Sequence, residues 1–523
     1  MVLQESTSET PEQGDVVPSQ LAPPIARLPP EILPIIFFEA VQTSPSKSVT
    51  ILNISRVSQL WRHIALSTPE LWTWIDTPDV GIIQTLMIRA KDRPLSVTLE
   101  QVSESNELVP LPISTVLKSL YNIRHLEFSV NYDDEWSRLG PFSEMSGPAP
   151  VLETLHLDGV RLPETLFSDS APSLRTLHLS TVDVEWRTIP DCPQLRSLSI
   201  NQPEIPISVP DFLQRLQTFP LLEKIETEWA FERNSLAVVL PGPVELTNLT
   251  YLLFDFEKVA NVLFALKHLR FPSSCKIKLY VAEDEPDEHL SLFSALSTCR
   301  TGSPPNVRAL KVIADSYLDI KLYEGDRKPR ENINVNEDAD DTRPNLVFKI
   351  RPPSEQHPLD TPRMATRICQ DYLNLNHLEA LDLFGKSPKV YPTKSFWEFI
   401  NTLPNLRVLK VRHSYAKSFI EFLSRSLGFT RGELPPFSSV HKLVYEDPTN
   451  EGEEYSIRLV LLVQKLQIRA VMGVPLKTLT LVQVGTIWVP IPDGLFVTLG
   501  GAVGQVKRKI KRLPYDQAQL VKE

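Results

Sequence analysis

The sequence predicts an α/β fold in which a small N-terminal helical module is followed by an irregular solenoid of parallel strands with helical or coil returns. The first observation is a short apolar motif, Leu-x-x-Leu-x-Leu, which recurs from about residue 120 almost to the C-terminus of the 523-residue chain. The second is a content of 46 prolines against 18 glycines, as expected when prolines punctuate repeated units. The third is a segment at residues 25–75 whose apolar residues follow helical spacing instead.

The first 24 residues are predicted to be a disordered tail. They are rich in Ser, Glu, Pro and Gln, and such a segment cannot bury enough apolar surface to offset the entropy lost on ordering. The same polar start predicts no secretory signal, and no stretch of the chain approaches the ~18 apolar residues of a membrane helix. We therefore expect structure to begin at Ile25, and we expect no membrane partner.

Residues 25–75 are predicted to form a compact unit of short helices. Pro29 and Pro30 suit a helix start, where a missing N–H costs nothing. The polar run at 43–46 ends this first helix. A second apolar run, from Ile51 to Ala65, predicts one amphipathic helix or two short ones in series. Thr68 with the proline after it then predicts the start of a last short helix.

Residues 76–523 are predicted to form the repeat array. Two successive motif copies, at Leu152 and Leu174, start 22 residues apart, inside the ~20–29-residue window of leucine-rich repeats. The last two apolar positions of each copy share one face of a strand, and the residue between them points to the other face. No copy can bury its apolar face alone, so stacked neighbours must do so. The clearest copies start at Leu152, Leu174, Leu195, Leu222, Leu249, Val307, Leu378, Leu406 and Leu476.

One segment, at about 324–364, is predicted to interrupt the array as a mostly mobile insertion with a possible strand at 345–350. It contains the acidic run 336–341 and many Pro, Arg and Asn residues. Near the C-terminus, the basic run 507–512 predicts a charged closing segment on the last repeat. A nuclear-import tag or an anion contact are the alternatives for that run.

Composition argues against catalysis, cofactors and nucleic acid. Scarce glycine disfavours phosphate-binding loops, and the chain has no Walker, HExxH or EF-hand pattern and no nucleophile elbow. We therefore expect no enzyme activity and no bound cofactor. The net charge of −10 makes the whole chain a poor general nucleic-acid binder. Four scattered cysteines without CxxC spacing predict no zinc or redox motif and a reducing compartment, either cytoplasmic or nuclear or both.

The segment 25–75 resembles an F-box, and most closely the F-box-like variety common in mushroom-forming fungi. The resemblance rests on three blocks that occur in the right order. They are Leu28-Pro29-Pro30-Glu31-Ile32-Leu33 followed by Ile36-Phe37, then Val57-Ser58-x-x-Trp61-Arg62-x-Ile64-Ala65, then Ser67-Thr68-Pro69-Glu70-Leu71-Trp72. A leucine-rich-repeat-like region after such a module is a common arrangement in that family.

This resemblance implies an adaptor. F-box proteins dock onto the Skp-type linker of a cullin-RING ubiquitin ligase, and their C-terminal domain presents a substrate. Carried over to this chain, the linker-facing residues are Leu28, Pro29, Ile32, Leu33, Ile36, Val57 and Trp61. The residues themselves leave a second hypothesis open, in which these side chains only pack onto the first repeat. The chain is then a leucine-rich-repeat interaction scaffold unconnected with ubiquitin.

An unknown protein target is expected on the extended inner face of the array, which the residues between the leucines form. Arginine is enriched in binding hot spots, so Arg175, Arg196 and Arg407 are the predicted target-binding residues. The insertion at 324–364 is the competing site. The inner positions mix acidic, basic and neutral side chains and so predict no charge for the target. We interpret His156 and His178, which share the inner slot of successive repeats, as solvated polar residues and not as metal ligands.

Overall fold

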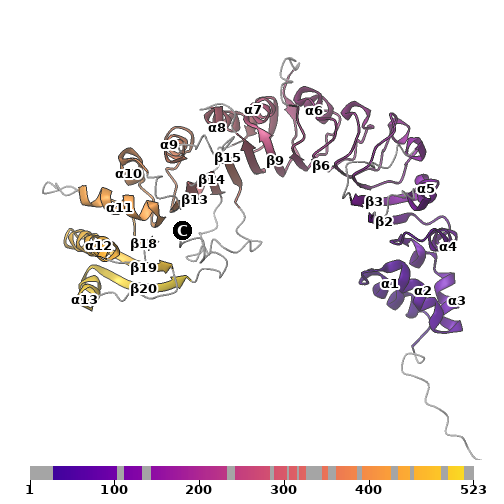
Figure 1. The fold of residues 1–523 in the computed structure, drawn as a ribbon, viewed down its shortest axis with the longest axis horizontal. Helices are drawn as coiled ribbons and strands as arrows, with labels where there is room; N and C mark the ends of the chain where they lie inside the picture. Colours follow the sequence, from indigo (N-terminus) through magenta and orange to yellow (C-terminus); the bar gives the residue numbers. More distant parts are fainter. Residues whose placement is uncertain are drawn as a thin grey trace, which may run out of the picture.

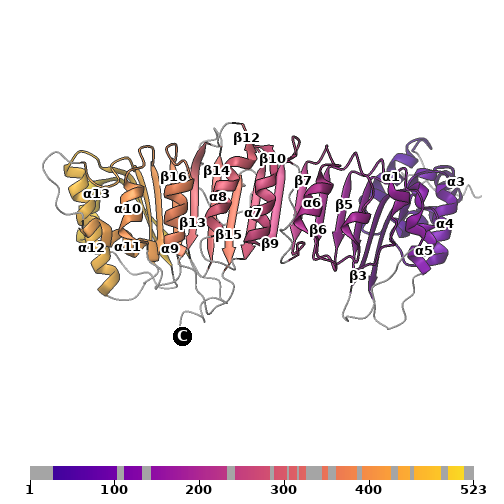
Figure 2. The same cartoon turned by 90° about the horizontal axis from the view of Figure 1, so that it is seen from above.

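The protein forms an arc, with strands along the inner side and helices along the outer side (Figure 1). A computed structural model describes residues 28–102, 111–131, 143–232, 242–282, 288–302, 306–314, 317–324, 344–351, 361–385, 392–425, 434–447, 453–484 and 493–511. Seen from above, the strands lie side by side along the length of the molecule (Figure 2). The predicted disordered tail at 1–24 lies outside the described residues.

Three short helices at one end of the arc form the N-terminal module. They are α1 (Leu33–Gln42), α2 (Lys47–Val57) and α3 (Gln59–Ser67), followed by the 3₁₀ turn η2 (Pro69–Trp72). Pro34 lies in the first turn of α1, where no helical partner for its missing N–H is needed. The predicted unit of short helices is confirmed, and the run 51–65 forms parts of two helices in series.

Asp76 fixes this module to the start of the array. The Asp76 carboxylate accepts hydrogen bonds from the backbone N–H groups of Lys47 (2.5 Å) and Ser48 (2.9 Å), at the N-terminus of α2. A carboxylate there satisfies unpaired donors and complements the helix dipole. Trp72 is fully buried, and its indole N–H donates to the carbonyl of Ala65 at 2.7 Å. The Asp76 contacts therefore join the module to the start of the array, and Trp72 belongs to the core of the module.

The main sheet has seventeen strands. Backbone pairing places them in a single continuous row. In spatial order the strands are β1 (Trp74–Ile75), β2 (Leu95–Val102), β3 (Ile123–Asn131), β4 (Thr154–Asp158), β5 (Thr176–Ser180), β6 (Ser197–Asn201), β7 (Lys224–Glu228), β9 (Tyr251–Lys258), β11 (Lys276–Ala282), β15 (Leu346–Arg351), β14 (Leu318–Glu324), β13 (Val307–Ala314), β16 (Ala380–Gly385), β17 (Val408–His413), β18 (Lys442–Asp447), β19 (Leu476–Val484) and β20 (Val503–Lys511). All neighbours are parallel except the two pairs that contain β14. The predicted α/β class with a long parallel sheet is therefore confirmed.

The segment predicted as an insertion contributes strands to this row. The expected strand at 345–350 is present as β15, which pairs with β11 on one side and with β14 on the other. The chain thus skips two places from β11 to β13, and then fills them backwards with β14 and β15. The structure therefore places β15 in the sheet and not in a protruding loop, while residues 325–343 and 352–360 lie outside the described part of the chain.

A left-handed residue ends many of the strands at the same place in the repeat. Thr181 (φ 48°), Gln202 (φ 46°) and Trp229 (φ 49°) directly follow β5, β6 and β7. Their N–H groups donate to carbonyls at the end of the next strand, at 2.9, 2.7 and 3.1 Å respectively. Of these and the equivalent residue after β4, Gly159 (φ 71°), only the glycine takes this conformation without strain. The turn is therefore maintained by the ladder of hydrogen bonds, not by sequence preference.

The returns between strands lie on the outer side and close the core. They are α4 (Val80–Ala90), α5 (Leu111–Leu117), α6 (Val209–Leu216), α7 (Val259–His268), α8 (Glu288–Cys299), α9 (Thr361–Arg367), α10 (Lys394–Asn401), α11 (Ser414–Arg425), α12 (Glu453–Val471) and α13 (Asp493–Ala502), with short turns η3 (Leu120–Asn122), η4 (Ser143–Ser146), η5 (Phe167–Asp169), η6 (Trp186–Thr188) and η7 (Ile368–Tyr372). A three-stranded sheet of β8 (Val244–Glu245), β10 (Leu269–Pro272) and β12 (Arg300–Thr301) lies among them. Motif leucines such as Leu177 and Leu409 are buried between the main sheet and these returns. Within the described ranges, no helix is both long enough and apolar enough to cross a membrane.

Candidate functional site

The N-terminal module carries a concentration of exposed apolar side chains. Of the seventeen exposed large hydrophobic residues in the described part of the chain, nine lie within residues 28–67. We call these nine residues the apolar surface: Leu28, Ile32, Ile35, Ile36, Phe38, Val49, Val57, Leu60 and Leu66. Soluble monomers rarely expose large contiguous apolar patches, so a concentration of this kind is typical of a surface that binds a partner.

Helix α1 is apolar on all sides, and only one stripe of it is buried. Leu33, Phe37 and Val41, four residues apart in turn, form that stripe. Ile32 (42% exposed) and Ile36 (36%) lie on the surface, as do Leu28, Pro29 and Val57. The prediction that Leu33 contacts a partner is wrong, because Leu33 is only 2% exposed and belongs to the core of the module.

Trp61 joins α3 to α1. Its ring lies 4.8 Å from the ring of Phe37, centroid to centroid, at 52°, and its backbone N–H donates to Ser58 Oγ, the N-cap of α3. Trp61 is half-buried. Trp61 therefore belongs partly to the core. In the sequence, the exposed residues Ile36 and Leu60 directly precede Phe37 and Trp61.

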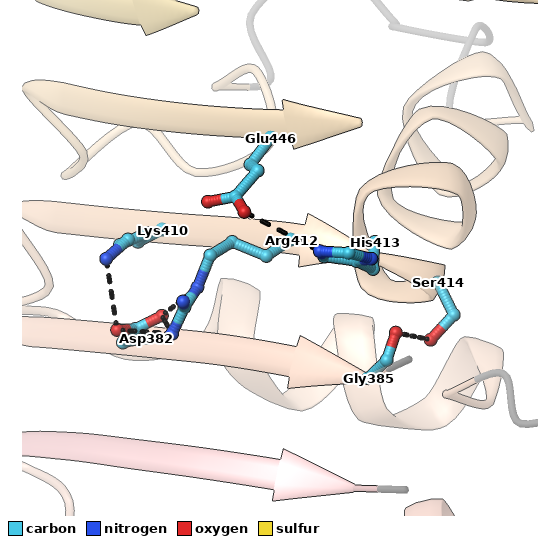
Figure 3. Close-up of polar contacts among 7 residues, drawn as sticks. All are labelled: Asp382, Gly385, Lys410, Arg412, His413, Ser414 and Glu446. Carbon is cyan, nitrogen blue, oxygen red and sulfur yellow. Dashed lines mark hydrogen bonds and ion pairs between the residues drawn. The ribbon is translucent and has the colours of Figure 1, made fainter. Parts of the chain in front are cut away.

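The second candidate site is a network of charged residues on the inner face near the C-terminal end of the arc (Figure 3). Arg412 on β17 binds Asp382 on β16 through both carboxylate oxygens, at 3.0 and 2.9 Å. Lys410 Nζ lies 3.4 Å from the same carboxylate. His413 Nε2 lies 3.5 Å from Glu446 on β18. Burial lowers the pKa of Lys410, while Asp382 acts in the opposite direction and Arg412 adds to the lowering.

The end of β16 approaches the next repeat too closely for any side chain. A Cβ on Gly385 would lie 2.5 Å from Ser414 Oγ and 2.8 Å from the carbonyl oxygen of Ala314. The Ser414 hydroxyl donates instead to the Gly385 carbonyl at 2.9 Å. The rings of His413 and Phe384 pack edge to face, 4.9 Å apart. This packing holds His413 and Arg412 at defined positions, with Arg412 also stacked 4.8 Å over the Phe384 ring.

The three predicted target-binding arginines are exposed, but they lie at the edge of the inner face. Arg175, Arg196 and Arg407 each immediately precede a strand, at equivalent positions before β5, β6 and β17. Arg196 forms an ion pair with Glu223, which precedes β7. The prediction places these arginines on the inner face itself. That face is formed by alternate residues within each strand, such as Thr176 and His178, and the arginines come just before the strands begin.

His156 and His178 stand side by side on β4 and β5, with ring centroids 5.2 Å apart. Burial lowers the pKa of His178, and the neighbouring His156 contributes in the same direction. Among the described residues, no group of three or more His, Cys, Asp or Glu side chains could hold a metal ion. All four cysteines are buried free thiols. Burial raises the pKa of Cys192 to about 12, which makes this thiol unreactive.

Several inner-face residues could not be found from the leucine motif, because their strands lack it. Lys278 on β11, Lys321 on β14 and Lys349 on β15 all alternate with buried residues. The signal that could have found them is strict apolar–polar alternation, as in Lys-Ile-Lys-Leu-Tyr-Val at 276–281. Their three strands are neighbours because the chain fills the sheet backwards, which no local pattern predicts.

Comparison with known proteins adds little to this picture. No protein-family model and no curated protein matches the chain. Among solved structures, the crystal structure of a complex of TLR13 with ssRNA13 is similar at 14% identity and a TM-score of 0.29, over 85% of this chain and 50% of that one. The chain thus spans about half the length of the TLR13 chain. Since the TM-score is this low, the likeness indicates nothing about function.

Proposed function

We propose that this protein is the substrate-receptor subunit of a cullin-RING ubiquitin ligase. In this proposal the N-terminal module docks to a Skp-type linker through the apolar surface, and the inner face of the array holds a protein target. The protein performs no chemistry of its own. It acts by proximity, since it keeps the target near the ubiquitin that the ligase transfers.

The observation that carries the proposal is the apolar surface on a module that hydrogen bonds of Asp76 join to the start of the array. Stable protein interfaces have an apolar core with a polar rim, and exposed isoleucines on α1 with Val57 and Leu60 near the start of α3 supply such a core. The Asp76 contacts to α2 fix the direction in which this surface faces. An adaptor needs this rigidity, because a target held at an undefined distance from the ligase is modified poorly.

The alternative is a repeat scaffold unconnected with ubiquitin, whose helical module only caps the array. Its supporting observation is that Leu33, Phe37 and Trp72 do pack inward and would cap the first strand in either case. The two functions differ in one respect that can be measured. A module that only closes the end of the array needs the buried stripe of α1 for packing. A module that also binds a linker protein needs the exposed side chains of the apolar surface as well.

The deciding experiment is co-purification of the full chain with a Skp-type linker. Ile32→Asp with Ile36→Asp should abolish the capture, because both side chains are exposed and a carboxylate would have to be desolvated in the interface. The matched control is Val471→Asp with Val497→Asp. It places the same charges on side chains that are 89% and 77% exposed, outside the module.

Capture should survive in the control variant. The far-ultraviolet circular dichroism of both variants should match that of the parent chain, because none of the four positions is buried. Failure of the parent chain to capture the linker, or equal loss in both variants, would favour the scaffold. Leu33→Asp is unsuitable for this purpose, since it would unfold the module and abolish capture under either function.

A further inference from the structure

The inner face of the arc is divided into an acidic half and a basic half. Inner-face residues are those that alternate along each strand with the positions packed against the outer returns. Among the residues whose side chains the structure describes, the charged inner-face residues from β2 to β9 are six acidic residues and two lysines. The acidic residues are Glu100, Glu127, Asp158, Glu226, Glu228 and Asp255. The lysines are Lys258 and Lys224, and Lys224 is paired with Glu226 at 2.9 Å.

From β11 to β20 the balance is reversed. Among the residues whose side chains are described, inner positions hold eleven lysines and arginines against three acidic residues, Asp319, Asp382 and Glu446. The whole chain has a net charge of −10, so the charge of this basic half is opposite in sign to that of the chain. The central row contains Lys278, Lys321, Lys311, Lys410 and Lys507, brought into line by the register of neighbouring strands.

The three acidic residues of this half are engaged within the protein. Asp382 binds Arg412 and Lys410, Asp319 lies 3.7 Å from Lys321, and Glu446 lies 3.5 Å from His413. Positive charge remains in excess around Lys311. Burial lowers the pKa of Lys311 to about 8, and the nearby charges of Arg412 and Lys321 lower it further, while Asp382 and Asp319 act in the opposite direction. An added anion would relieve this repulsion.

We infer that the basic half of the inner face binds an extended, Asp/Glu-rich segment of the target protein. This rests on the part of the proposed function in which the array holds a target. Nine strands spaced ~4.8 Å apart span about 38 Å, which an extended peptide of about 12 residues at ~3.3 Å per residue would cover. Lysines placed singly on successive strands match carboxylates spread along a chain. A compact dianion such as a phosphate is favoured instead by clustered arginine, and Arg412 is occupied by Asp382.

The acidic half disfavours nucleic acid as the ligand. A polyanion long enough to follow the arc would leave the basic half and meet the carboxylates of β2 to β9, where like charges repel it. A short acidic segment avoids this repulsion, because it can end at β11. The same carboxylates would orient the segment, since any basic residues flanking it would face the acidic half.

The test measures binding of fluorescein-labelled 12-residue peptides to the purified full chain, by fluorescence anisotropy without any linker protein. The probes are a Glu–Ser alternating peptide, the same peptide with Gln for Glu, its phosphoserine counterpart with Gln for Glu, and a 12-nucleotide single-stranded RNA. We expect the Glu peptide to bind at least about tenfold more tightly than each of the others. Raising NaCl from about 0.05 to 0.5 M should weaken it, because salt screens exposed charges.

The decisive variant is Lys278→Gln with Lys321→Gln and Lys507→Gln. It should weaken binding about tenfold or more, from the loss of three exposed or half-exposed ion pairs. A second variant, Lys276→Gln with Arg351→Gln and Lys509→Gln, uses only exposed positions and so leaves folding unaffected. The control is Lys118→Gln with Lys267→Gln and Lys394→Gln, which removes three exposed charges from the returns on the outer side.

Equal weakening in the control variant, or tighter binding of the RNA, phosphopeptide or Gln peptide, would overturn the inference. The readout involves no ligase component. Loss of peptide binding with intact linker capture would therefore refute the inference alone, and loss of linker capture with intact peptide binding would refute the adaptor function alone.

Discussion

A buried carboxylate in the middle of the arc should make the protein less stable as the pH rises. Glu257 on β9 is only 2% exposed. One of its oxygens accepts a hydrogen bond from the backbone N–H of Ala230, at 2.7 Å, in the loop that follows the preceding strand. Burial raises the pKa of Glu257 to about 7; the backbone hydrogen bonds from Ala230 and Phe231 oppose this, and the charge of Asp255 adds to it.

The magnitude follows from the difference in pKa between the folded and unfolded chains. The ordinary pKa is 4.5 and the folded one is about 7, and each unit corresponds to ~1.4 kcal/mol. Between these pH values the folded chain keeps a proton that the unfolded chain has released. Stability therefore falls with rising pH across this window. The loss from this single group amounts to about 3 kcal/mol and is complete above pH 7.

The perturbation is Glu257→Gln, which removes the titration but keeps an oxygen for the Ala230 N–H. Urea denaturation followed by tryptophan fluorescence, from pH 4.5 to 8, gives the free energy of unfolding for both proteins. The variant should gain about 3 kcal/mol relative to the parent chain across that range. A hydrogen bond lost on substitution would only shift the whole curve. Glu245→Gln, at an exposed residue of β8, is the control and should follow the parent chain. Parallel curves for Glu257→Gln and the parent would refute the reasoning.

Three further predictions concern stability and assembly. Leu177→Ala should cost about 2–5 kcal/mol in urea denaturation, because Leu177 is 1% exposed; His178→Ala should stay within about 0.5 kcal/mol, and equal effects would mean that the strand phase is wrong. Arg469→Met should lower the free energy of unfolding by about 3 kcal/mol or more in the same assay. The guanidinium donates to the carbonyls of Val474, Pro436 and Ser438 at 2.7, 3.1 and 3.2 Å, and each carbonyl would lose this donor. Arg469→Lys should restore only part of this stability, and full restoration would show that charge alone matters. Asp76→Ala should lower the free energy of unfolding by about 1–2 kcal/mol, because it leaves the N-terminus of α2 uncapped. Amide hydrogen exchange in α2 should become faster, and an unchanged exchange rate would refute the capping role of Asp76.

Most of the strands could be predicted because the leucine motif identifies which residues of each strand face the core. Leu155 and Leu157 are buried on β4, with His156 on the inner face between them, as the motif requires. The first two strands could not be predicted in this way. The residues of β1 are a pair at Trp74–Ile75, too short for any period, and β2 places its buried residues within Leu-Ser-Val-Thr-Leu, an alternation without the motif. The sequence therefore predicts a strand of the array only where the repeat contains most of the leucine motif.

The apolar surface illustrates a different limit. Helix α1 is apolar on every side, so spacing alone could not separate Leu33, which is buried, from Ile32 and Ile36, which are exposed. The choice depends on which stripe meets α3, and the Phe37–Trp61 contact decides it. The charge division of the inner face was hidden for a similar reason. Lys321 and Lys311 become direct neighbours only because β14 fills the sheet backwards.

The position of the basic half also bears on how the proposed adaptor would work. The helical module ends the arc on one side and β20 on the other, and the inner face between them is concave (Figure 1). A target held from β11 to β20 would therefore face the module across the opening, and would not lie against it. Under that proposal, the acidic half would lie between the bound segment and the end of the arc that docks to the ligase. Under the proposed function, the division of charge sets the place of the target along the arc as well as its chemistry.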